Sequence, residues 1–149
     1  MTTKEYLRRD KDLRAAIKCK QELLKDLEQT TGLLKGIDYS REKVQGGSVD
    51  IEAKLVASID KLEEAKKELR GMILVYTDLH LTLLEQIEAM PTELYRSILN
   101  YHYIIGLTLE EVQDRINYSR RQTFRLYDAA LEEFAETNST ALSLNGTYC

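Results

Sequence analysis

Cysteine, proline and tryptophan are scarce in this chain of 149 residues, which holds two cysteines, one proline and no tryptophan. Cys19 and Cys149 lie near opposite ends of the sequence, so a disulfide framework is not expected. The two histidines are equally isolated, and no spacing of His and Cys is typical of a metal site. The sequence therefore predicts neither a metal ion nor a cofactor.

Long apolar runs are also missing. The most apolar segment, residues 72–87, is interrupted by Asp78, His80 and Glu85, so it is not expected to cross a membrane. The first residues lack the apolar core of a signal peptide, and we expect a cytoplasmic protein without membrane contact. Paired carboxylates, a nucleophile–base pair and a glycine-rich phosphate loop are absent from the sequence too, so an enzyme is not expected.

Charged residues are abundant, at 31% of the chain, in a composition typical of an all-α protein. Residues 4–35 predict one long helix, with apolar residues in steps of four and three. Asp10, Lys20 and Thr31 interrupt this stripe. The glycines that follow predict a loop at 36–49.

A second long helix is predicted from about Ser48 to Ala89, and its pattern is the most regular in the chain. Unbroken four-three steps are typical of a helix in a left-handed coiled coil. Lys66 and His80 stand at two of the positions of this pattern, where a polar residue usually sets the register or the oligomeric state of a coiled coil. A pH-sensing or ligand-binding role is the alternative for His80. The predicted coiled-coil contacts are Leu55, Ile59, Leu62, Leu69, Ile73, Tyr76, Leu83 and Ile87.

Two partners suit this stripe. The helix 4–35 folds back on it as an antiparallel hairpin, or a second copy of the chain pairs with it. The first helix is shorter and more weakly patterned, so it does not cover all of the second. We therefore expect residues 1–90 to form a helical hairpin arm that also makes a homodimer.

Pro91 marks the end of this arm, because proline disfavours helix at the residue before it and suits the start of the next helix. Residues 91–135 then predict three helices, the first ended by Gly106, in a small helix-turn-helix domain. The polar residues 136–149 predict a flexible tail. The three helices are predicted at 92–105, 109–116 and 120–135.

Local signals support the last two helices. Thr108 with Glu111, and Ser119 with Gln122, have the spacing of capping boxes. Asn117 lies between them and tolerates the left-handed backbone of a tight turn. The residues expected to close the small core are Leu94, Ile98, Ile105, Leu109, Val112, Ile116, Thr123, Leu126, Ala130 and Phe134.

The opposite face of the helix 120–135 is rich in arginine. Arginine, glutamine and aromatic side chains at the start of such a helix are typical of contacts with base edges, and the helix N-termini suit phosphates. Double-stranded DNA is therefore the expected partner. The alternative is a solvated face whose arginines pair with Asp114, Asp128 or Glu132. The predicted DNA contacts are Ser119, Arg120, Arg121, Gln122, Phe124 and Arg125.

The runs Gly106–Val112, Arg115–Ile116 and Tyr118–Gln122 resemble the helix-turn-helix in the fourth region of bacterial sigma factors. The resemblance is closer to small phage-encoded sigma-like regulators. In these, a long helical hairpin precedes the module and its loop carries a stretch similar to Val44–Ser48. The resemblance extends to Phe134. It implies a regulator of phage or prophage genes in the host cytoplasm, with promoter DNA bound at the residues named above and RNA polymerase as a further contact.

The net charge of −4 argues against a DNA-binding protein that acts alone, since affinity for the DNA backbone comes from Lys and Arg on phosphates. Binding then needs a dimer or a polymerase partner. The competing function is a helical protein-interaction module, or a phage inhibitor, that binds a host protein or nucleoprotein complex. An acidic surface suits that role as well.

Overall fold

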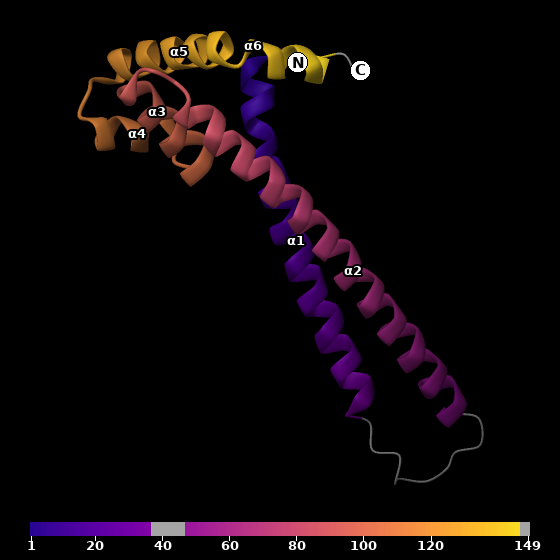
Figure 1. Ribbon diagram of the computed structural model, residues 1–149. Coiled ribbons are helices and arrows are strands. Elements are labelled where there is room, and N and C mark those ends of the chain that lie inside the picture. The colour runs from indigo at the N-terminus through magenta and orange to yellow at the C-terminus, as the bar shows by residue number, and fades with distance from the viewer. Residues whose placement is uncertain (37–46, 147–149) are drawn as a thin grey trace. The chain divides into compact units, whose positions relative to one another are not determined.

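The computed structural model describes residues 1–36 and 47–146, and within them the protein is all-α, as the composition predicts (Figure 1). The predicted loop 36–49, with its Val44–Ser48 stretch, lies largely outside these residues. Where it is described, Gly47 already begins the second helix. The elements are α1 Thr3–Lys35, α2 Gly47–Glu88, α3 Glu93–Leu99, η1 Asn100–Ile105, α4 Leu109–Ile116, α5 Arg120–Thr137 and α6 Ser139–Gly146.

The chain divides into two compact units, and this division differs from the predicted boundary at Pro91. One unit is Ala15–Leu74, and the other combines Met1–Arg14 with Val75–Cys149. The ends of the two long helices belong to the second unit because their apolar side chains enter its core. Tyr6 and Leu7 of α1 lie in one buried cluster with residues of α3, α4 and α5. We call this second unit the head.

In the unit Ala15–Leu74, α1 and α2 run antiparallel (Figure 1). Lys20 Nζ lies 2.6 Å from Glu68 Oε2, and the hydroxyls of Thr31 and Ser58 form a short hydrogen bond. From Lys20 to Thr31 the position on α1 moves forward, while the partner on α2 moves back from Glu68 to Ser58, as expected for antiparallel helices. Lys20 and Thr31, the polar interruptions of the α1 stripe, therefore have polar partners within the chain.

The predicted coiled-coil contacts of α2 mostly face inward. Leu69, Leu83 and Ile87 are buried, and Leu55, Ile59, Leu62 and Tyr76 are half-buried. Ile73 is exposed while Met72 beside it is half-buried, so Ile73 is not a buried contact within the hairpin, and its place in a homodimer stays a prediction. A shift of the buried position by one residue agrees with the drift of the contact face of an α-helix relative to a strict heptad.

The head has the predicted three-helix arrangement with one local departure. Ile98, Val112, Thr123, Ala130 and Phe134 are buried as expected, in α3, α4 and α5. Leu94, Leu109, Ile116 and Leu126 are partly buried against them. The buried face of α5 is therefore packed into this core.

The departure is a π-helix, η1, in place of the last turns of the predicted helix 92–105. The wider turns of a π-helix change the direction in which the following side chains point, compared with a continuous α-helix. Tyr103 becomes buried, whereas Ile105, expected in the core, is 57% exposed. Gly106 ends the element, as predicted, and has the left-handed conformation with φ 93°.

The tail also differs from the prediction. Helix α5 continues to Thr137, and α6 occupies much of the segment 136–149 that was expected to be flexible. Asn138 Nδ2 donates to the carbonyl of Phe134 at 3.1 Å and to that of Gln86 at 3.4 Å. Leu142 packs against the core of the head. A few tertiary contacts therefore hold a segment whose composition alone suggests disorder.

Candidate nucleic-acid interface

The two helices α4 and α5 begin at the predicted capping boxes. The Glu111 amide donates to Thr108 Oγ1 at 3.2 Å, and the Thr108 amide donates to Glu111 Oε2 at 2.9 Å. At α5, the amides of Gln122 and Ser119 donate reciprocally to the Ser119 hydroxyl and the Gln122 side-chain oxygen, at 3.3 and 3.4 Å. Both helix starts are therefore set by residues within the first turn.

The turn between α4 and α5 depends on Asn117. This residue has φ 59° and ψ 40°, the left-handed conformation, and its amide donates to the Gln113 carbonyl at 3.0 Å. Asn adopts this conformation more readily than most residues because its short polar side chain forms local hydrogen bonds. The turn has the form expected for a helix-turn-helix.

Replacing Asn117 by valine is expected to lower the free energy of unfolding by about 1–2 kcal/mol, because a β-branched side chain is strained at positive φ. Asn117→Gly is the matched control, since glycine adopts this conformation freely. Urea unfolding followed by circular dichroism measures both. Equal midpoints for the valine and glycine variants would contradict the assignment of strain to this position.

The exposed face of α5 carries the predicted contact residues. Ser119, Arg120, Arg121, Gln122, Phe124 and Arg125 are all exposed, while the opposite face, from Thr123 to Phe134, enters the core. Among the described residues, no carboxylate forms an ion pair with the three arginines of this face. The predicted alternative of pairing with Asp114, Asp128 or Glu132 is therefore not seen there. We call the six residues the α5 face.

Two features organise the α5 face. The Arg120 guanidinium lies 5.8 Å from the centre of the Phe124 ring, within the range of a cation–π contact. A hollow of about 170 Å³ is lined by Tyr118, Gln122, Arg125 and Leu126, two of which belong to the α5 face. The Gln122 side-chain oxygen is committed to the cap of α5, so its amide NH₂ is the group left for an external acceptor.

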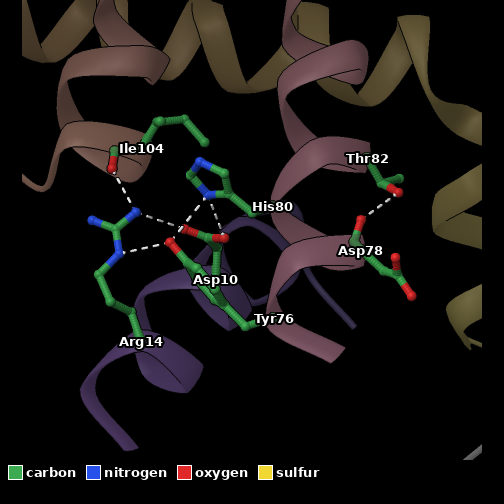
Figure 2. Close-up of polar contacts among 7 residues, drawn as sticks. All are labelled: Asp10, Arg14, Tyr76, Asp78, His80, Thr82 and Ile104. Carbon is green, nitrogen blue, oxygen red and sulfur yellow. Dashed lines mark hydrogen bonds and ion pairs between the residues drawn. The ribbon is translucent and has the colours of Figure 1, made fainter. Parts of the chain in front are cut away.

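A buried polar cluster in the head was not predicted as a unit (Figure 2). Asp10 is fully buried and accepts from Arg14 Nη2 at 3.2 Å, while His80 Nδ1 lies 2.9 Å from its other oxygen. Arg14 also donates to the Tyr76 hydroxyl at 3.0 Å and to the Ile104 carbonyl at 2.8 Å. The cluster joins α1 and α2 to the end of η1.

One feature of the sequence pointed to this cluster, because Asp10 and His80 are polar residues at positions where the helical pattern is otherwise apolar. The structure assigns His80 a hydrogen-bonding partner within the head, which agrees with a register-setting role. Arg14 binds the carbonyl of Ile104 near the end of a helical element, where carbonyls lack helical partners. The cluster therefore ties the end of η1 to α1 and α2 within the head.

The described residues contain neither a membrane-spanning helix nor a metal-binding cluster. None of their helices has the length and apolar character needed to cross a membrane. No group of three or more His, Cys, Asp and Glu side chains is placed there to hold a metal ion.

Residues 33–135, more than half of the chain, match the model of a family described as proteins of unknown function, DUF1492. No curated protein matches the chain, and no solved structure does. The matched span includes all of α2 and the helix-turn-helix. The chain belongs to the DUF1492 family.

Proposed function

We propose that this protein is a DNA-binding transcriptional regulator of phage or prophage genes that reads promoter DNA with α5. The observation that carries the proposal is the α5 face itself. Three exposed arginines without carboxylate partners occupy the first turns of the second helix of a capped helix-turn-helix. This is the part of the motif that enters the major groove in proteins that use it.

The chemistry of the α5 face suits base recognition. Arg121 and Arg125 lie one turn apart, and a guanidinium pairs in bidentate fashion with the acceptors of guanine. Phe124 offers an apolar surface for a thymine methyl group. The exposed N-terminus of α5 at Ser119 suits a backbone phosphate.

The acidic balance of the chain, −4 overall, requires additional binding energy from a partner. A homodimer doubles the number of DNA contacts, and RNA polymerase at a promoter provides an adjacent protein surface. We include both in the proposal, together with a location in the host cytoplasm and a role that involves no catalysis.

A second candidate function is that of a helical protein-interaction module that binds a host protein or nucleoprotein complex. In the head, Val75 and Leu81 of α2 are 61% and 53% exposed. In this second candidate function, these exposed apolar side chains are the proposed contacts with the partner protein. They are compatible with a polymerase or with a second copy of the chain as the partner.

The test is a DNA-binding assay with the full chain. Labelled duplexes from upstream of the neighbouring genes are titrated at low salt, with and without host RNA polymerase, against a scrambled duplex. We expect retardation of at least one upstream duplex at a protein concentration about tenfold below that needed for the scrambled one. Equal binding to all duplexes, or none with polymerase present, would rule out the proposed function and favour the interaction module.

A further inference from the structure

A cavity in the head lies away from the α5 face. Its volume is about 290 Å³, and its walls come from three elements of the head: α1, η1 and α5. The lining residues are Lys4, Arg8, Lys11, His102, Tyr103 and Tyr127. No carboxylate is among them, although the chain as a whole is acidic.

Three cationic side chains of α1 gather at the cavity. Lys4, Arg8 and Lys11 are four and three positions apart, so they share one face of the helix. Asp12 approaches Arg8 at 3.5 Å, but both side chains are strongly exposed, and such a pair is weak in water. The cavity is therefore lined by an excess of positive charge.

The inner wall holds a pair of tyrosine hydroxyls. Tyr103 and Tyr127 are 5% and 6% exposed, and their oxygens lie 2.5 Å apart. Burial raises the pKa of Tyr103 far above its usual value, so this phenol keeps its proton. One hydroxyl donates to the other, and the second hydroxyl proton has no hydrogen-bond acceptor among the described residues. A buried donor therefore lines a cationic cavity.

His102 holds this wall in place. Its Nδ1 lies 2.8 Å from the Leu107 carbonyl, which only accepts, so Nδ1 carries a proton. Burial lowers the pKa of His102, and nearby Lys11 also lowers it, so the ring adds no positive charge at neutral pH. The ring packs edge-on against Tyr103 and Tyr127, with centroid distances of 4.7 and 5.4 Å.

We propose that this cavity binds the phosphate group of a small phosphorylated molecule. A phosphate presents several acceptor oxygens and more than one negative charge, which matches two ammonium groups, a guanidinium and a hydroxyl donor. A single carboxylate would leave most of these donors unused. The volume is near the lower end of the range for small-molecule sites, which suits a compact ligand. This site is separate from the DNA-binding proposal, since it uses none of the residues of the α5 face.

Calorimetric titration of the full chain with pyrophosphate, at constant ionic strength, tests the proposal. We expect saturable binding that weakens at least tenfold in the double variant Arg8→Gln with Lys11→Gln. The control, Lys18→Gln with Lys25→Gln, removes the same charge from exposed positions of α1 outside the cavity, and its affinity is expected to match the wild type. The absence of saturable binding to the wild type, or an equal loss of affinity in both double variants, would overturn the proposal.

Two further measurements examine the buried wall and the source of the phosphate. Tyr127→Phe removes one hydroxyl, and we expect several-fold weaker pyrophosphate binding with an unchanged circular dichroism spectrum; unchanged affinity would refute the role of the tyrosine pair. A short DNA duplex is expected not to displace pyrophosphate. Displacement that depends on Arg8 and Lys11 would instead assign the cavity to the nucleic-acid backbone and overturn the small-molecule site.

Discussion

Replacing Asp10 by alanine is expected to lower the free energy of unfolding of the protein by about 2–3 kcal/mol. Asp10 is fully buried. One of its carboxylate oxygens accepts a hydrogen bond from Arg14, and the other lies within hydrogen-bond distance of His80 Nδ1. Without the carboxylate, these groups lose their partner in a site largely closed to water. The expected loss is at the lower end for buried charge pairs, because the Arg14 side chain is 39% exposed and retains access to solvent.

The matched control is Asp12→Ala, on the same helix two positions further along. The Asp12 side chain is 65% exposed, and its contact with Arg8 is a surface ion pair. Its removal is expected to change the free energy of unfolding by less than about 0.5 kcal/mol. Urea unfolding monitored by circular dichroism measures both variants. Similar losses for Asp10→Ala and Asp12→Ala would contradict a structural role for the buried cluster.

The cluster also shows what could be predicted from the sequence and what could not. The four-three pattern of both long helices indicated which face of each is buried, because that pattern is local. The pairing of Asp10 with His80 joins positions far apart in the chain. Two isolated polar residues in two stripes do not reveal that they meet, since the relative alignment of the helices is set by all of their contacts together.

The helix-turn-helix was predictable because its signals, like the pattern of the long helices, are local in the sequence. The bounds of α4 and the start of α5 follow from capping boxes within four residues and from one residue, Asn117, in the turn. The π-helix η1 and the helix α6 were not predicted, because both depend on tertiary contacts. Arg14 at the Ile104 carbonyl and Asn138 at Gln86 come from distant parts of the sequence.

The two candidate sites also differ in how far they could be predicted from the sequence. The α5 face lies on one helix, so its residues could be named from helical periodicity, and the structure confirms their exposure. The cavity near Arg8 combines side chains of α1, η1 and α5. Its three cations share a helical face, but the tyrosines that complete it come from distant segments, one of them in an unpredicted π-helix.

Arg121→Ala combined with Arg125→Ala is expected to weaken specific DNA binding by about 100-fold or more. A bidentate contact between arginine and guanine contributes about 1–3 kcal/mol of discrimination, and two such contacts are removed. Alanine is a strong helix former and both side chains are exposed, so α5 is expected to remain folded. Fluorescence anisotropy with the retarded duplex gives the affinities, and circular dichroism verifies the fold.

The informative control removes the same charge elsewhere. Lys67 and Arg70 are exposed on α2, outside the head, and Lys67→Ala with Arg70→Ala changes the net charge as much as the α5 variant does. If α5 reads bases, the control retains specific binding, whereas the α5 variant retains only the affinity shown for scrambled DNA. A purely electrostatic contact would instead make both variants lose affinity together, with the loss growing smaller as salt increases. That result would contradict base reading by the α5 face and leave the protein-interaction module as the better explanation of this fold.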